Sequence, residues 1–92
     1  MGRWLHSGLR RDICVVVADL GGGTDREIKA ALERRYEERV SPSQYQGALD
    51  ALVRQGYLDR VVDGVQDRVT LTETGARAVR EQATWLQDAV EE

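Results

Sequence analysis

Residues 41–75, SPSQYQGALDALVRQGYLDRVVDGVQDRVTLTETG, contain the signals for a helix, a hairpin and a second helix start. A serine N-cap at Ser41, with proline at the first helical position and glutamine at the third, is typical of a helix start. The periodicity predicts a helix that runs from Tyr45 to Arg54 and stops at Gly56, because glycine readily adopts the left-handed conformation at a helix end. Two β-branched runs then flank Asp63-Gly64, a dipeptide that favours a tight hairpin turn.

This order of elements predicts a winged helix-turn-helix, an α+β and mainly helical fold with a two-stranded β-wing. Upstream, a helix is predicted over about Ser7 to Leu20, ended by three glycines, and another begins at a capping box that starts with Thr24. The chain, residues 1–92, is predicted to be one domain. Residues 1–71 would form the winged-helix core and residues 72–92 a long C-terminal dimerisation helix.

The last helix is more apolar than one small domain requires. From Ala76 to Val90, apolar residues recur at intervals of 3, 4, 3 and 4, and a second stripe lies beside this seam. One stripe is expected to pack on the core and the other on a partner copy; a single broad core face is the alternative. The predicted dimer interface comprises Val79, Ala83, Trp85, Leu86 and Val90. The first helix and Trp4 are the next candidates.

The sequence also resembles a known family. Residues 49–58, LDALVRQGYL, resemble the "x-L-x-x-L-v-x-x-G-l-l" stretch of winged-helix regulators, and residues 71–75, LTETG, resemble the "L-T-x-x-G" that follows their wing. The chain is most similar to small archaeal PadR-like proteins, and more loosely to MarR-like proteins, although Gln46-Gly47 stand where PadR-like helices usually carry Tyr-Pro. The resemblance implies a homodimeric, sequence-specific transcription regulator, expected to be a repressor, that binds double-stranded DNA.

A spacing of about 100° per residue divides the helix over residues 41–55 into two faces. The predicted core face contains Tyr45, Ala48, Leu49, Leu52 and Val53. The opposite face contains Ser43, Gln44, Gly47, Asp50, Ala51 and Arg54. Glycine within a helix costs about 1 kcal/mol relative to alanine. Gly47 is therefore either neutral drift or a point where the backbone approaches a partner closely.

The same helix supplies the expected DNA contacts. The N-terminal residues of a recognition helix meet base edges in the major groove, and glutamine can bond to N6 and N7 of adenine. Arg54, at the far end, is better placed for a phosphate, and Asp50 is expected to pair with it at i+4. The predicted DNA-binding residues are Ser41, Ser43, Gln44, Gln46, Arg54, Arg60 and Arg68.

The last two of these residues belong to the wing. A turn at Asp63-Gly64 places Arg60 opposite Asp67 and Asp59 opposite Arg68, as cross-strand ion pairs that contribute about 0.2–1 kcal/mol each. Alternatively, an arginine contacts a phosphate or the minor groove, and we expect at least one of the two to do so.

Composition argues against an enzyme. His6 is the only histidine and Cys14 the only cysteine, and the Gly21-Gly22-Gly23 run lacks the lysine of a P-loop. We therefore expect no catalysis, no metal and no cofactor. No apolar stretch approaches the roughly 18–20 residues of a membrane span, and no secretory signal is evident, so a cytoplasmic protein without a membrane partner is expected.

Two alternatives to DNA binding follow from charge and size. Residues 1–68 contain eleven basic and eleven acidic residues, so the formal net charge of −3 comes from residues 69–92. A neutral core and an acidic last helix favour a winged-helix protein–protein interaction module without DNA binding, which salt dependence would distinguish. A small-molecule-responsive regulator is the weaker alternative, because 92 residues leave little room for a pocket outside a dimer interface.

Overall fold

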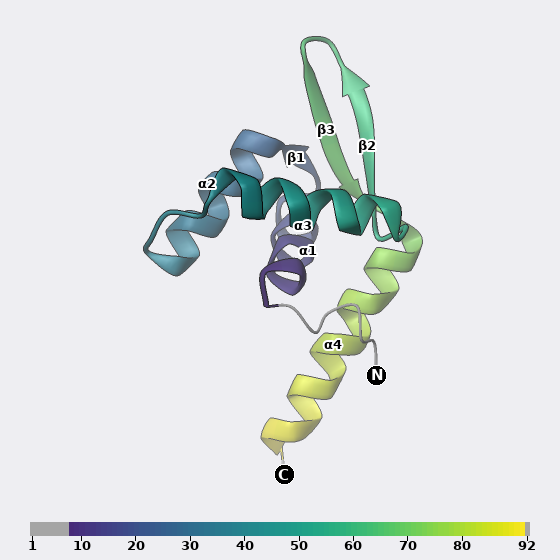
Figure 1. Cartoon of the computed structure of the whole chain (residues 1–92). Coiled ribbons are helices and arrows are strands. Elements are labelled where there is room, and N and C mark those ends of the chain that lie inside the picture. The colour runs from purple at the N-terminus through teal and green to yellow at the C-terminus, as the bar shows by residue number, and fades with distance from the viewer. Residues whose placement is uncertain (1–7, 92) are drawn as a thin grey trace.

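The computed structural model describes the backbone of residues 8–91 and the side chains of residues 8–62 and 64–83. Within that range the order of elements is α1 (Gly8–Leu20), β1 (Gly23–Thr24), α2 (Asp25–Tyr36), α3 (Pro42–Arg54), β2 (Leu58–Asp63), β3 (Gln66–Leu71) and α4 (Glu73–Glu91). The mainly helical α+β class is confirmed, and β2 and β3 form a wing that projects from the helices (Figure 1).

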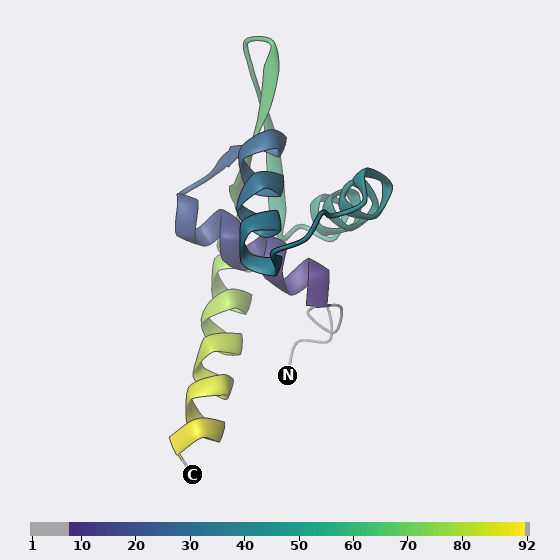
Figure 2. The same cartoon turned by 90° about the vertical axis from the view of Figure 1, so that its left-hand side faces the viewer.

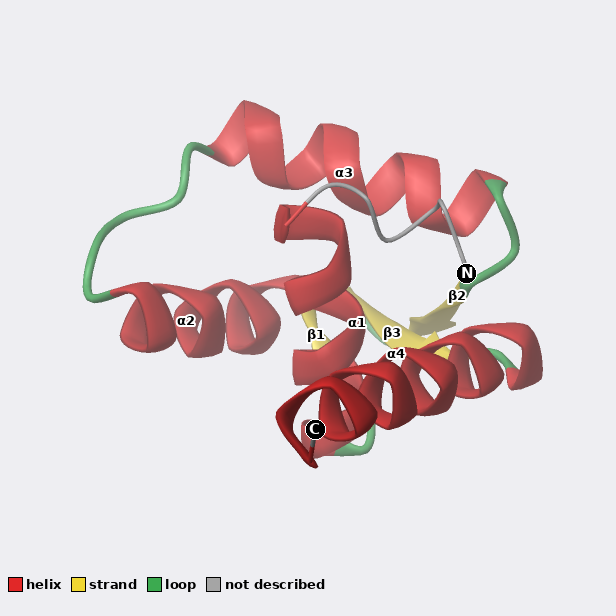
Figure 3. Cartoon of the chain, turned by 90° about the horizontal axis from the view of Figure 1, so that it is seen from below, coloured by secondary structure: helices red, strands yellow, loops and turns green. Residues whose placement is uncertain are grey.

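The core is built around α1, which contacts α2, α3, α4 and β3. Seen from below, α1 lies in the middle, with α3 on one side and α4 on the other (Figure 3). The largest fully buried side chains are Ile13, Cys14, Val17, Ile28, Leu32, Tyr45, Leu49, Leu52, Leu58 and Val69. Burial of each large apolar side chain contributes about 1.5–3 kcal/mol, so this cluster fixes how the helices pack. It also raises the pKa of the Cys14 thiol to about 12, as befits a core cysteine.

The predicted core face of α3 is confirmed, with one difference. Tyr45, Leu49 and Leu52 are fully buried and Val53 is half-buried. Ala51, which the helical angle assigns to the outer face, is buried as well. β2 contacts α3, and Arg60 of that strand reaches Asp50, so tertiary contact covers part of the face that the helical angle leaves outside.

The sheet has three strands instead of the predicted two. Its order is β1-β3-β2, all antiparallel, with Gly23 paired to Val69 and Thr24 to Arg68. Gly22, at φ 100°, lies so close to β3 that an added Cβ would stand 3.2 Å from the carbonyl oxygen of Val69. The glycine run therefore ends α1, as predicted, and also lets the chain approach β3 closely.

The turn of the wing lies one residue later than predicted. Asp63 pairs with Gln66, which leaves Gly64 and Val65 as the two turn residues. Gly64 has φ 67° and occupies the first central position, the position that type II′ turns reserve for glycine. The position of the glycine within the turn therefore sets the register.

This register removes the predicted cross-strand ion pairs. Arg60 faces Val69 and Arg68 faces Val61, so both of those pairs are wrong. Because successive strand residues point to opposite faces, Arg60 lies on the same face of the wing as Leu58, and Arg68 lies on the other.

Thr72 holds the start of α4 against the residues that precede β2. Its hydroxyl accepts the N–H of Gly75 at 3.0 Å and donates toward the carbonyl oxygens of Gly56 at 2.6 Å and Tyr57 at 3.1 Å. Its own N–H also donates to the carbonyl of Tyr57. A Cβ added to Gly75 would overlap that same carbonyl oxygen. The close approach of α4 to the carbonyl of Tyr57 thus explains both the threonine and the glycine of the LTETG motif.

The rest of α4 leaves the body of the domain. The helix has 19 residues, and its C-terminal half extends away from the other elements in two perpendicular views (Figures 1 and 2). Near its start, Ala78 is buried and Val79 packs against the core, whereas Ala83 is exposed. The side chains of the other predicted interface residues, Trp85, Leu86 and Val90, lie outside the described residues, as do Trp4 and His6.

Substitution of Gly75 by alanine is expected to destabilise the fold by about 1–3 kcal/mol, because the methyl group would force α4 away from the backbone of Tyr57. Thermal and denaturant unfolding measure this change. Thr74→Ala, at the exposed neighbouring position, should stay within about 0.5 kcal/mol of the parent. A Gly75→Ala protein as stable as the parent would contradict the close packing described above.

Candidate functional site

The N-terminus of α3 is held firmly and faces outward. Before it, the buried Val40 donates its N–H to a carboxylate oxygen of Glu33 at 2.8 Å, which anchors the loop from α2. Ser41 then caps α3, accepting the N–H of Gln44 at 3.4 Å, and its hydroxyl oxygen lies 3.1 Å from that of Ser43. The side chain of Gln44 is exposed and makes no hydrogen bond among the described residues. It is therefore available to a partner.

Asp25, in the first turn of α2, fixes the next side chains of α3. One carboxylate oxygen accepts the hydroxyl of Tyr45 at 3.4 Å, and the other accepts Nε2 of Gln46 at 3.4 Å. Burial, followed by the charge of Asp25, raises the pKa of Tyr45, so this tyrosine remains a protonated donor. With its nitrogen turned to Asp25, Gln46 keeps Oε1 as a free acceptor. Sequence reasoning missed Asp25, because no local pattern links residues 21 positions apart.

Asp25 itself is positioned by the cap of α2. Thr24 Oγ1 accepts the N–H of Glu27 at 3.2 Å, and a carboxylate oxygen of Glu27 accepts the N–H of Thr24 at 2.9 Å. The predicted capping box is therefore confirmed. Hydrogen bonds from the backbone and then the side chain of Thr24, with a smaller contribution from the charge of Arg68, lower the pKa of Glu27.

Asp50 pairs with the wing and not with Arg54. Its Oδ1 lies 3.3 Å from Nη2 of Arg60, which corrects the predicted i,i+4 pair within α3. Both side chains are partly exposed, so this ion pair contributes at most about 1 kcal/mol to stability. Its main consequence is electrostatic, because the only carboxylate on the outer face of α3 is neutralised by an arginine from β2. Arg54 stays exposed at the last turn.

Arg68 is separated from the other predicted residues. Six of the seven predicted side chains lie on α3, at its cap or directly beside it, whereas Arg68 lies on the opposite face of the wing. There its guanidinium is next to Gly22, and its charge acts on Glu27. The structure thus gathers one polar surface on α3, which we call the α3 surface: Ser41, Ser43, Gln44, Gln46, Gly47, Asp50, Arg54 and Arg60.

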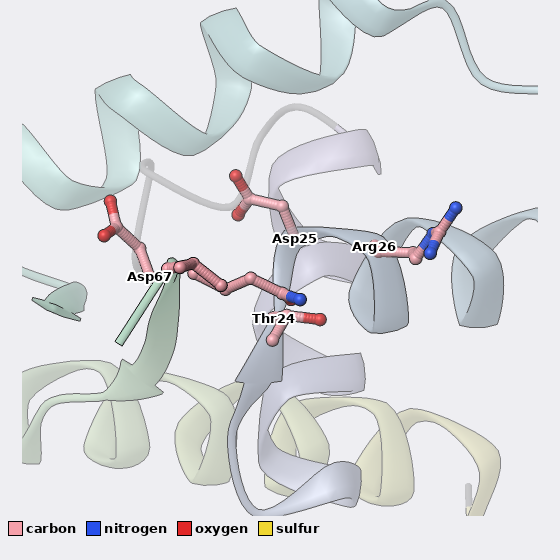
Figure 4. Close-up of a pocket in the computed structure, with 6 residues that line it drawn as sticks. Thr24, Asp25, Arg26 and Asp67 are labelled. Atoms are coloured by element: carbon pink, nitrogen blue, oxygen red, sulfur yellow. The ribbon is translucent and has the colours of Figure 1, made fainter. Parts of the chain in front are cut away.

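A second feature, which the sequence did not reveal, is a cleft between the wing tip and the N-terminus of α2. It has a volume of about 450 Å³ and is lined by Thr24, Asp25, Arg26, Val65, Gln66 and Asp67. Figure 4 shows Asp25 extending toward α3, whereas Arg26 points away from Asp67. Two carboxylates and one guanidinium make this a poor site for an anion. Among the described residues, no cluster of three or more metal-ligating side chains occurs either.

The wing tip combines exposed valines with aspartates and carries no basic residue. Between residues 61 and 67 the only charged side chains are aspartates, and Val62 and Val65 are 77% and 100% exposed. This composition does not suit phosphate binding. The two arginines of the wing, Arg60 and Arg68, both lie nearer its base.

Comparison with known proteins identifies solved structures with a similar fold. The sequence matches no protein-family model and no curated protein. Among solved structures, RosR of H. salinarum is similar, with a TM-score of 0.85 and 25% identity, over 90% of this chain and 76% of that one. A putative transcriptional regulator, ytfH from Salmonella typhimurium, has a TM-score of 0.72 and 26% identity, over 97% and 76% of the two chains.

A third structure, F93 from STIV, is described as a winged-helix DNA-binding protein; it has a TM-score of 0.73 and 16% identity, over 98% of this chain and 95% of that one. The element order, the wing and these neighbours together give the chain a winged-helix fold. Within the part of the chain that the structure describes, no helix is long and apolar enough to cross a lipid bilayer.

Proposed function

We propose that this chain is a sequence-specific transcription regulator that binds double-stranded DNA as a homodimer and acts as a repressor in the cytoplasm. In this proposal the recognition helix, residues 41–55, enters the major groove, and the protein has neither enzymatic activity nor a cofactor. The names of the similar structures support it, since two are described as transcriptional regulator or DNA-binding protein. The PadR-like subfamily stays a prediction.

The observation that carries the proposal is the outward-facing N-terminal half of α3. Its apolar side is buried on α1, so Ser43, Gln44 and Gln46 are presented together at the end that meets base edges in a helix-turn-helix protein. The hydrogen bond from Gln46 Nε2 to Asp25 leaves Oε1 as an acceptor. That acceptor matches the exocyclic amine of adenine or cytosine in the major groove.

The charge of the α3 surface is compatible with DNA. A free carboxylate would repel phosphates, but Asp50 is paired to Arg60. Arg54 then adds one uncompensated positive charge to each copy. Affinity from phosphate contacts would be modest for one copy, so a dimer that doubles them is consistent with this charge.

Support for the homodimer comes from α4. Its C-terminal half extends beyond the body of the domain, and its sequence continues the apolar seam through Leu86 and Val90. A helix that projects in this way commonly buries its apolar stripe against another copy. Ala83, which is exposed, lies on the same seam.

One observation favours the alternative, a winged-helix module that binds protein and not DNA. The wing tip exposes Val62 and Val65 beside acidic side chains, a surface better suited to a protein partner than to phosphates. The two functions differ in salt dependence, because binding that releases counterions from DNA weakens steeply as salt rises.

Three substitutions on α3 should affect DNA binding in two distinct ways. Gln44→Ala or Gln46→Ala is expected to cost about 1–3 kcal/mol at the preferred site and to relax the choice of base at one position. Arg54→Ala should weaken all sequences about equally and lower the salt slope by about one unit per copy. Binding is measured by fluorescence anisotropy at several salt concentrations.

Arg77→Ala is the control for this experiment, since it removes an exposed arginine from α4, a helix that contributes no residue to the α3 surface. It should leave the affinity unchanged. A parent protein that binds no DNA at low salt, or three α3 variants that bind like the parent, would argue for the protein-binding module instead.

Neutralisation of Asp50 should strengthen binding to DNA. Asp50→Asn removes a negative charge from the α3 surface and releases Arg60 to a phosphate, so affinity for all sequences is expected to rise about fivefold. The matched control is Asp59→Asn, which makes the same charge change on the opposite face of the wing. Equal effects of the two substitutions would mean that Asp50 does not face the DNA.

Charge placed in the seam of α4 should separate the copies. Leu86→Glu is expected to give a monomer in analytical ultracentrifugation, because a carboxylate is poorly tolerated in an apolar interface. Gln87→Glu adds the same charge outside both apolar stripes of the sequence and should stay dimeric. A Leu86→Glu protein that remains fully dimeric would move the interface elsewhere, with the first helix and Trp4 next to be tested.

A further inference from the structure

We propose that Gly47 is the point at which the backbone of α3 comes closest to the base edges of DNA, and that any side chain at this position prevents the helix from seating fully in the major groove. This inference rests on the proposed DNA-binding function and deepens it. It assigns to a residue without a side chain the role of setting the depth of the recognition helix.

The first observation is that nothing within the described chain requires glycine at position 47. A Cβ built on Gly47 meets no heavy atom within 4 Å, and the residue lies in the middle of α3 without a positive φ. Several other glycines have a reason within the fold. Gly56 and Gly64 adopt positive φ values, and Gly75 would collide with the backbone of Tyr57.

The second observation is the loss of stability that glycine causes at position 47. Glycine in a helix interior lowers the folding equilibrium constant about fivefold relative to alanine, because the unfolded chain loses more conformational freedom. Alanine would fit at position 47 without any contact, so glycine there lowers the stability of α3 without a packing reason.

The third observation is the shape of the surface around Gly47. Its neighbours on the helix face, three and four positions away, are Ser43, Gln44, Asp50 and Ala51. Ser43 is short, Ala51 is buried, and Asp50 is drawn back to Arg60. The backbone at Gly47 is therefore exposed, with open space where a side chain would stand and with the longer side chains of Gln44 and Gln46 beside it.

The exposed backbone at Gly47 and the polar side chains around it suit contact with a DNA duplex, and no contact within the described chain explains the glycine. An α-helix only just fits into the major groove, so the depth to which it enters decides whether short polar side chains reach base edges. The side chain of Ser43 is short, and Gln46 has only its Oε1 free as an acceptor. A methyl group at position 47 would hold the helix about 1.5 Å further out, roughly the length of one C–C bond, and weaken both contacts together.

The experiment is a graded series, Gly47→Ala, Gly47→Ser and Gly47→Leu, tested on a duplex selected by the parent protein from a random pool. Gly47→Ala is expected to raise the thermal midpoint by about 4–8 °C. The same variant should weaken binding to the selected duplex about tenfold, with a larger loss for leucine. Gly8→Ala is the matched control, since it replaces the exposed glycine at the start of α1, and it should not change affinity.

A gain in stability with a loss of affinity supports the inference, because a merely structural role would move both in the same direction. Should Gly47→Ala bind the selected duplex as tightly as the parent, the inference is wrong, while the proposed function stands. A parent protein that selects and binds no duplex would overturn both.

Discussion

The apolar face of α3 packs against α1, and this contact fixes the orientation of the helix. Tyr45, Leu49 and Leu52 are fully buried there, and the hydroxyl of Tyr45 reaches Asp25 at the start of α2. Because a helix has only one rotation that buries all three, this packing also decides what faces outward. The serines, Gln44, Gln46 and Gly47 are exposed as its direct consequence, and the wing then places Arg60 beside Asp50.

Much of the fold could be predicted because its signals are local. Helical periodicity and capping residues mark α2 and α3, and the LTETG motif marks the start of α4, where Thr72 forms its cap. The errors occur where a contact joins distant residues. β1 contains only two residues and exists because β3 lies beside it. The register of the wing depends on whether glycine occupies the first or the second central position of the turn, and the local sequence is compatible with both.

The candidate site could be predicted in its residues better than in its contacts. A helical angle suffices to find Gln44 and Arg54 on the outer face, since that face is set by periodicity. It does not reveal that Asp25 orients Gln46 or that Asp50 pairs with Arg60, because these contacts cross from one element to another. The formal net charge of −3 likewise does not describe the α3 surface, because Asp50 is paired to Arg60 there.

Selection of bound duplexes from a random pool by the purified full chain tests DNA binding, base preference and dimer symmetry together. We predict enrichment of a palindromic motif, with half-sites separated by about 10 base pairs or a multiple of it, as expected for a two-fold dimer with one α3 in each major groove. Binding to that motif should weaken steeply with salt. No enrichment over the starting pool at low salt would contradict sequence-specific DNA binding, and would assign the α3 surface to a protein partner.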